Sequence, residues 1–187
     1  MESLPELPAL MARYGAGDSI AASALVAHLS PQLRRFFLLE PMSRSHADDL
    51  LQETWLRIHR VRHTYRPREP VLAWVYAIAR HVRTDHFRKS YRIRSREESL
   101  GGREDFPQPA TGRAAHALDL ESLLRPLPES QREVVFLMKI CGLSLEEVAR
   151  ATSSSVGSVK QKAHRAYETL RKALTGKEVG HAGSRYR

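Results

Sequence analysis

The sequence predicts an all-α fold with two small helical domains joined by a flexible linker, and a helix-turn-helix in the C-terminal domain. Apolar residues recur at helical spacing along several stretches, and no stretch alternates apolar and polar residues between turn residues as a strand does. Residues 97–117 combine paired glycines, two prolines and small polar residues without a sustained period, which is typical of a linker. We therefore expect domains at residues 1–96 and 118–174.

The N-terminal domain is predicted to contain amphipathic helices over residues 25–37, 50–61 and about 71–91. Each range places its large apolar residues on one face, at intervals of three and four. Trp74 lies on the buried stripe of the last range, so a role in the core is favoured for it, although its ring also suits stacking on a base.

Residues 143–174 are predicted to form two short helices joined by a tight polar turn, the layout of a helix-turn-helix. The second helix directs polar and basic side chains outward, namely Ser155, Ser158, Lys160, Gln161, Lys162, His164 and Arg165. Because Lys and Arg bind phosphates or guanine edges and Gln bonds adenine, this face suits the major groove of DNA. A basic solvated helix is the alternative. Residues 175–187 are expected to form a disordered tail.

The chain has 30 Lys and Arg against 21 Asp and Glu, and its formal net charge of +9 favours a polyanionic partner. Charge alone does not separate nucleic acid from an anionic membrane. No apolar run approaches the roughly 20 residues that span a bilayer, and the first residues lack a basic stretch followed by a hydrophobic block. We expect a cytoplasmic protein without stable membrane insertion.

Residues 80–96 hold seven arginines and lysines against one acid, Asp85. An ordinary solvated helix intersperses acids that support it at i,i+4, so a run of one sign favours contact with nucleic acid. The preceding helix differs, because Asp48, Asp49, Gln52 and Glu53 lie on faces that its apolar stripe leaves exposed. These acids either interact with the helix dipole or bind a protein partner, since an acidic patch would repel DNA.

No catalytic site, metal or cofactor is expected. The nine histidines lack metal-ligand spacing, no glycine-rich phosphate loop occurs, and no Ser, His and acid grouping is evident. The single cysteine, Cys141, lies in an apolar stretch, where a buried packing role is favoured over redox sensing. The sequence therefore argues against an enzyme.

Two motif blocks resemble a known family. DDLLQETWLRIHRV and LAWVYAIARHVRTDHFRK, followed after the linker by LRPLPESQREVVFLMKICGLSLEEVARATSSSVGSVKQKAHRAYETLRKAL, are similar to bacterial sigma factors of the extracytoplasmic-function (ECF) group. The resemblance covers about residues 21–174. It implies a two-domain helical protein that binds core RNA polymerase, directs it to promoters and helps to melt DNA. It also implies contacts with the largest-subunit clamp helices and the flap of the second-largest subunit, and control by an anti-sigma factor.

The resemblance also implies roles for individual residues. Asp49, Gln52 and Glu53 would bind polymerase. The segment from Thr64 to Leu72 and the helix after it would capture an unpaired base of the minus-ten element. The implied DNA contacts of this region are Arg66, Val71, Leu72, Arg80, His81, Arg83, Arg88 and Lys89. The outward face of the helix-turn-helix would read the minus-thirty-five element.

The chain departs from the family pattern at positions that affect DNA reading. Ser153 stands in the turn where the family commonly has glycine, which costs stability if that position has a positive φ. Lys162 replaces a common arginine, and its ammonium cannot make a bidentate contact with guanine. His81 replaces a frequent asparagine near the base-capture pocket.

Two other functions stay open at this point. A transcription regulator that uses only the helix-turn-helix would leave the acidic patch and the cationic run unexplained. A sigma mimic that titrates an anti-sigma factor without binding DNA would be expected to lack the cationic faces that this chain retains.

Overall fold

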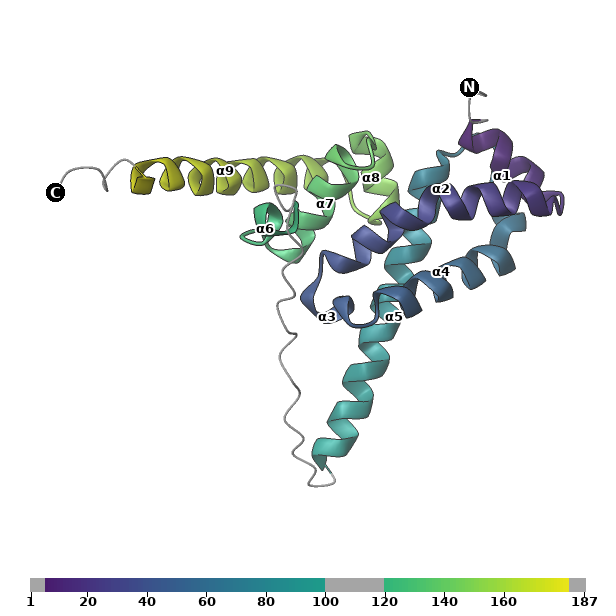
Figure 1. Cartoon of the computed structure of the whole chain (residues 1–187), viewed down its shortest axis with the longest axis horizontal. Helices are drawn as coiled ribbons and strands as arrows, with labels where there is room; N and C mark the ends of the chain where they lie inside the picture. The colour runs from purple at the N-terminus through teal and green to yellow at the C-terminus, as the bar shows by residue number, and fades with distance from the viewer. Residues whose placement is uncertain (1–5, 100–119, 182–187) are drawn as a thin grey trace. The chain divides into compact units, whose positions relative to one another are not determined.

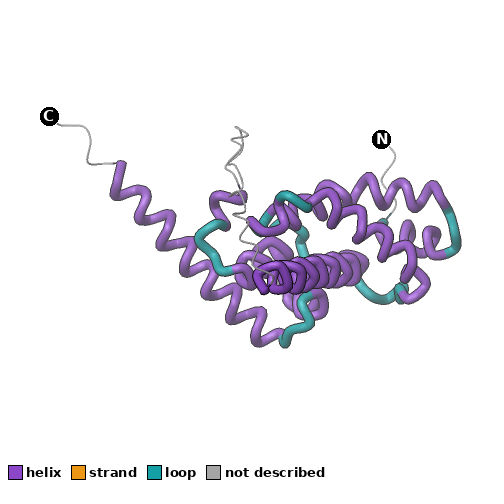
Figure 2. The backbone as a smooth tube through the Cα atoms, turned by 90° about the horizontal axis from the view of Figure 1, so that it is seen from below, coloured by secondary structure: helices purple, strands orange, loops and turns teal. Residues whose placement is uncertain are grey.

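The structure is a computed structural model that describes residues 6–99 and 120–181. All regular elements in these ranges are helices, joined by loops (Figure 2). They form two compact units (Figure 1). The first contains α1 (Leu7–Gly15), α2 (Ser19–Leu38), α3 (Pro41–Arg44), α4 (Ala47–Val61), the 3-10 helix η1 (Arg62–Thr64) and α5 (Val71–Ser99). The second consists mainly of α6 (Leu120–Leu124), α7 (Glu129–Lys139), α8 (Leu145–Ala151) and α9 (Val156–His181). The predicted all-α fold class is confirmed.

Two helices extend beyond their predicted ends. Helix α5 continues to Ser99, into the range predicted as linker, and residues 100–117 of that range lie outside the described residues. Helix α9 continues to His181, past the predicted end of the domain at residue 174, and residues 182–187 are not described. Apolar periodicity fades before either helix ends, but no proline stops the backbone hydrogen bonding.

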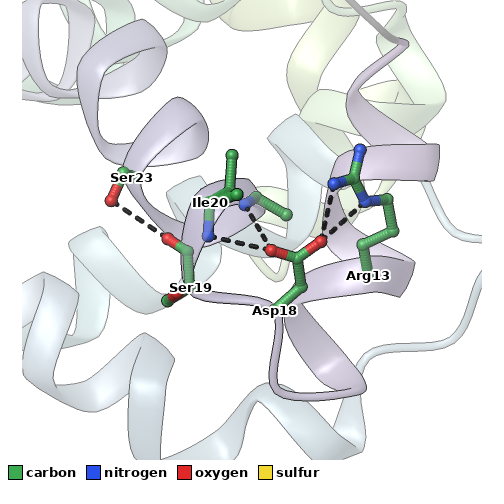
Figure 3. Close-up of polar contacts among 6 residues, drawn as sticks. Arg13, Asp18, Ser19, Ile20 and Ser23 are labelled. Atoms are coloured by element: carbon green, nitrogen blue, oxygen red, sulfur yellow. Dashed lines mark hydrogen bonds and ion pairs between the residues drawn. The ribbon is translucent and has the colours of Figure 1, made fainter.

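Helix α1 is an addition to the predicted elements. It buries Leu10, Met11 and Tyr14 and turns directly into α2. Asp18 caps α2, because its Oδ1 accepts hydrogen bonds from the backbone N–H groups of Ile20 (2.8 Å) and Ala21 (3.1 Å). The other carboxylate oxygen pairs with Arg13 of α1, 2.6 Å from Nη2 (Figure 3). One side chain thus fixes both the end of α1 and the start of α2.

The apolar faces of α2, α4 and α5 form the core of the first unit. Phe36 and Phe37 of α2, Ile58 of α4 and Tyr76 of α5 are at most 2% exposed. The rings of Phe36 and Tyr76 meet edge to face, with centroids 5.4 Å apart. The predicted apolar stripes therefore face mostly inward, whereas Val26 is 41% exposed and Leu51 and Trp55 are half-buried.

The second unit packs α7 against α9, with Phe136, Val159 and Ala166 completely or almost completely buried. Helix α8 begins with a reciprocal cap: Ser144 Oγ accepts the N–H of Glu147 at 3.2 Å, and Glu147 Oε2 accepts the N–H of Ser144 at 2.7 Å. The buried position of Cys141 agrees with a packing role.

The turn between α8 and α9 contains a strained residue. Ser153 has a φ of 51°, in the left-handed region that favours glycine. Two residues later, Ser155 caps α9, because its Oγ accepts the N–H of Ser158 at 3.2 Å. The turn that sets the direction of the second helix is thus built from serines.

Candidate functional site

The acidic face of α4 is exposed. Asp49, Gln52 and Glu53 all lie on the surface, and their spacing of three and four places them on one face of the helix. The side chain of Asp49 is 82% exposed. Its neighbour Asp48 instead binds Arg34 of α2, with Oδ1 2.7 Å from Nε, and this hydrogen bond lowers the pKa of the Asp48 carboxyl.

A largely apolar groove of about 630 Å³ lies beside this face, between α2 and α4. Val26 of α2 and Leu51, Trp55 and Leu56 of α4 line it, and Leu56 is 44% exposed. The indole Nε1 of Trp55 donates a hydrogen bond to Ser30 Oγ at 3.0 Å, which fixes the ring across the groove. Gln52 belongs to both the groove and the exposed polar face. Apolar side chains gathered in an exposed groove with a polar rim are typical of a protein interaction surface.

One end of the groove is polar. Tyr14 Oη lies 3.0 Å from His59 Nδ1, and the guanidinium of Arg62 lies 5.8 Å from the centroid of the Tyr14 ring. Burial raises the pKa of the Tyr14 hydroxyl, and the charge of Arg62 partly opposes this shift. The groove therefore combines an apolar centre with a hydrogen-bonding, basic end.

The loop between η1 and α5 is held in a defined conformation. Tyr65 Oη donates to the carbonyl of Glu69 at 2.7 Å, and the Tyr65 ring meets Trp74 of α5 edge to face, with centroids 5.5 Å apart. Burial raises the pKa of Tyr65, and the charge of Glu69 adds to the shift. Arg66 and Arg68 are exposed on the loop. Arg68 was not among the predicted DNA contacts, although it lies within the segment from Thr64 to Leu72 that was predicted to capture a base.

The two predicted DNA contacts at the start of α5 differ in how far their side chains are buried. Leu72 is half-buried, whereas Val71 is 3% exposed and belongs to the core. The assignment of Val71 as a DNA contact is therefore corrected, because a buried side chain cannot reach a base or phosphate.

The cations of α5 do not form one continuous surface. Arg80 is half-buried and His81 is exposed, but Arg83 is 3% exposed, with its guanidinium 4.6 Å from the centroid of the Phe36 ring. This packing corrects the assignment of Arg83 as a DNA contact. Arg88 and Lys89 are exposed, further along the helix.

An ion pair and a ring contact connect α4 and its N-cap residue His46 to α5. Asp85 Oδ2 lies 2.9 Å from Arg57 Nη1, and this hydrogen bond lowers the pKa of the Asp85 carboxyl. The rings of His46 and His86 have centroids 4.6 Å apart. Burial lowers the pKa of His86, and the positive charges of His46 and Lys89 add to this shift, whereas the charge of Asp49 opposes it.

The basic side of α9 is exposed as predicted for a DNA-reading face. Lys160, Gln161, His164 and Arg165 are exposed, and Ser158 and Lys162 are half-buried. Ser155 is also exposed, but its hydroxyl caps α9, so its contribution to a DNA contact is limited by that hydrogen bond.

Within residues 6–99 and 120–181, no group of three or more His, Cys, Asp and Glu side chains is arranged to hold a metal. No helix in these ranges is long and apolar enough to cross a bilayer.

Comparison with known proteins finds two family models on this chain. The model described as Sigma-70 region 2 matches residues 25–93, and the model described as Sigma-70, region 4 matches residues 117–170. ECF RNA polymerase sigma factor SigF of Caulobacter vibrioides is 35% identical over 171 residues, which cover 88% of this chain and 91% of the relative. RNA polymerase sigma factor CarQ of Myxococcus xanthus is 31% identical, with 88% and 95% covered.

Solved structures show the same fold. The sigma factor RpoE of Bartonella quintana, solved in complex with the anti-sigma factor NepR, has a TM-score of 0.62 at 25% identity, and the match covers 80% of this chain and 94% of that one. CnrH, solved in complex with the cytosolic domain of CnrY, has a TM-score of 0.64 at 24% identity, with 90% and 97% covered.

Proposed function

Because the chain belongs to the ECF group of sigma-70 RNA polymerase sigma factors, we propose that α4 binds core RNA polymerase, that the 65–70 loop and α5 act on the minus-ten element, and that α9 reads the minus-thirty-five element. One observation carries this proposal: the region 2 match falls on α2 to α5 and the region 4 match on α6 to α9, so each matched region coincides with one helical unit. Because the protein is proposed to act on core polymerase, we place its activity in the cytoplasm.

The groove between α2 and α4 supports the polymerase contact. It supplies apolar surface beside Asp49, Gln52 and Glu53, and apolar burial contributes most of the affinity at an interface while charges orient the partner. The favoured partner is the pair of clamp helices of the largest polymerase subunit. The helix-turn-helix unit is the part expected to reach the flap of the second-largest subunit.

The polymerase contact is tested by charge reversal. The double variant Asp49→Lys/Glu53→Lys should lose association with core polymerase by more than tenfold and keep its helical content, since exposed substitutions usually change stability by less than about 0.5 kcal/mol. The control Glu6→Lys/Glu168→Lys makes the same change in charge at exposed residues outside the groove and should bind normally. If helicity falls only in the first variant, the acids act through the helix dipole instead.

The DNA contacts of the first unit are proposed to be Arg66, Arg68, Leu72, Arg80 and His81. The exposed arginines of the braced loop would hold the backbone of a strand whose base is unpaired. The variant Arg66→Ala/Arg68→Ala should reduce promoter melting, measured by permanganate reaction at unpaired thymines. A template that is already mismatched around the start site should restore part of its activity.

The function as a whole is tested by transcription with purified core polymerase. We expect specific initiation only when this protein is added. Repression of a promoter by the protein alone, without initiation in the presence of core enzyme, would favour a plain DNA-binding regulator.

We further infer that an anti-sigma factor controls the protein. The support is the likeness to RpoE, which was solved with its anti-sigma factor, and the apolar groove that such a partner would occlude. A co-expressed inhibitor that competes with core polymerase for Asp49 and Glu53 is the expected form of control.

A further inference from the structure

The turn between α8 and α9 consists of hydroxyl residues in succession, namely Thr152, Ser153, Ser154 and Ser155. Three of them are buried or occupied. Thr152 is 4% exposed, Ser154 is half-buried, and the hydroxyl of Ser155 caps α9. Ser153 is exposed, and its hydroxyl makes no hydrogen bond with any residue that the structure describes. A solvent-accessible hydroxyl without a structural task is therefore left at this position.

The backbone holds Ser153 in a conformation that suits glycine better. Its N–H donates to the carbonyl of Arg150 at 3.2 Å, and the N–H of Ser154 donates to the carbonyl of Ala149 at 2.9 Å. These two bonds end α8 in a Schellman motif, in which the residue with positive φ is usually glycine. Ser153 occupies that place with a φ of 51°. A side chain that is present despite backbone strain is a candidate for a functional role.

The charge pattern before Ser153 suits a protein kinase. Arg150, in the last turn of α8, is exposed and precedes Ser153 by three positions. Kinases select their substrates by the charges around the accepting hydroxyl, and a basic residue three positions before a serine is a common pattern. The accessible hydroxyl of the turn thus also has a recognition element beside it.

Ser153 lies close to the part of a helix-turn-helix that enters DNA. In this motif the N-terminal residues of the second helix contact base edges in the major groove. Ser153 precedes Val156, the first residue of α9, by three positions, and consecutive Cα atoms are about 3.8 Å apart, so their Cα atoms are at most about 11 Å apart. The Debye length at about 0.1 M salt is about 10 Å. A charge on Ser153 therefore acts on the DNA that α9 would read.

We propose that Ser153 is a phosphorylation site and that a phosphate on it blocks reading of the upstream element by α9. This inference rests on the proposed sigma function. Phosphorylation adds about 1.5 to 2 negative charges to a turn of four neutral side chains, close to the phosphates of the DNA. Promoters that depend on the upstream element then lose initiation, while the polymerase contact of α4 is retained.

The modification is a phosphoryl transfer from a nucleoside triphosphate, which a serine kinase supplies. The hydroxyl oxygen of Ser153 attacks the γ-phosphorus, and a new O–P bond forms while the bond from the γ-phosphorus to the bridging oxygen breaks. The nucleoside diphosphate leaves with that electron pair, and the hydroxyl proton passes to a base of the kinase. Hydrolysis of the phosphoester by a phosphatase returns serine and inorganic phosphate, so the control is reversible.

The first test measures promoter binding by holoenzyme that carries phosphoserine at position 153, incorporated during synthesis of the full chain. Its affinity for promoter duplex should fall by about tenfold at about 0.1 M salt, and the loss should decrease as added salt screens the charge. The control carries phosphoserine at position 130, where the native Ser130 is exposed on α7, and should bind like the unmodified protein. Unchanged affinity with phosphoserine at position 153 overturns the proposal.

Two substitutions separate modification from a direct DNA contact of the hydroxyl. Ser153→Ala and Ser153→Gly both remove the hydroxyl, and holoenzyme with either variant should bind promoter duplex normally, because the unmodified hydroxyl has no partner. A loss of affinity in both variants would show that the hydroxyl itself binds DNA, and the proposal would be wrong.

The last test detects the modification. The full chain, incubated with γ-labelled ATP and an extract of the cells that produce it, should take up phosphate at Ser153, located by mass spectrometry. Ser153→Ala should lose this label, Arg150→Gln should reduce it severalfold, and Ser130→Ala should keep it. Absence of label on Ser153, or full labelling of Arg150→Gln, overturns the proposal. Failure of the unmodified protein to support initiation would instead overturn the sigma function, so the two failures are distinguishable.

Discussion

Ser153 is the residue whose backbone is least suited to its side chain, with a φ of 51° in the turn of the helix-turn-helix. The left-handed region costs a residue with a Cβ atom about 1–2 kcal/mol. Glycine avoids this strain, but it loses more conformational entropy on folding, and this loss offsets part of the gain. We expect Ser153→Gly to raise the free energy of unfolding of the C-terminal unit by about 0.5–1 kcal/mol. Urea unfolding followed by circular dichroism measures this change.

The neighbouring serine provides the control for this prediction. Ser153 is the only non-glycine residue with positive φ in the described ranges, so Ser154→Gly relieves no strain. It should lower stability, because glycine adds conformational freedom to the unfolded chain. An equal gain in both variants would show that strain at Ser153 is not the cause.

His86 should make the stability of the first unit depend on pH. Its pKa in the folded protein lies below 6.5 because of burial and the nearby His46 and Lys89 charges. As the pH falls, His86 is therefore protonated at a higher pH in the unfolded chain than in the folded protein. The contribution of His86 to the free energy of unfolding is fully present above about pH 6.5. It is lost as the pH falls from there through the folded-state pKa.

The measurement is the urea midpoint between pH 7.5 and 5. His86→Gln should show a smaller decrease than the unmodified protein, and His28→Gln, at an exposed position on α2, should follow the unmodified protein. The same decrease in all three proteins would assign the pH dependence to groups other than His86.

Arg83 shows what sequence reasoning misses at this scale. A count of charges along the chain groups it with the other cations of residues 80–96. Its burial follows from position, because Tyr76 and Ala79, at seven and four residues before it, lie on the same buried side. The pattern was present in the sequence, but a linear count does not distinguish helix faces.

At the scale of the element, alanine variants of α9 should distinguish contacts with bases from contacts with phosphates. Arg165→Ala and Lys160→Ala should weaken holoenzyme binding at the upstream element, by about 1–3 kcal/mol where a base edge is contacted. Removal of a base contact should lower the affinity for the native element only. Removal of a phosphate contact should lower the affinity equally for the native element and for a scrambled element. Competition binding with both duplexes measures the difference, and Lys172→Ala, further along the exposed side of α9, is the control.

The long helices were predictable because burial follows a 3.6-residue period over many turns, as for α2, α4 and the first part of α5. Helix α1 was missed because nine residues give too few turns for a period to be evident. The groove was not predictable either. Val26 lies on a stripe that was predicted to be buried, and only the packing of α2 on α4 leaves it at the surface, in the groove that Leu56 also lines.

At the scale of the whole molecule, each unit has a core of its own. Phe36, Phe37 and Tyr76 are buried within the first, and Phe136 and Val159 within the second. We expect fragments 1–99 and 118–187 each to fold alone with a cooperative thermal transition, measured by circular dichroism. A fragment that retains helix but melts without cooperativity would show that its core depends on the rest of the chain.

Division into two units with an intervening segment was evident in the composition, because glycine and proline gather at 97–117. The assignment of each unit to one promoter element came only from resemblance, since charge and periodicity alone do not indicate which DNA sequence a helix reads.

The exposed end of α5 also offers a label-free reporter of promoter occupancy. Trypsin cleaves after Arg and Lys in backbone that has locally unfolded, and a helix with no packed side opens at little cost. Within the described residues, Arg88, Lys89 and Arg92 therefore mark exposed bonds at which trypsin should cut the free protein. DNA on this segment would keep it helical and slow the cut, so the rate at which these peptides appear by mass spectrometry measures the fraction of holoenzyme engaged on its template.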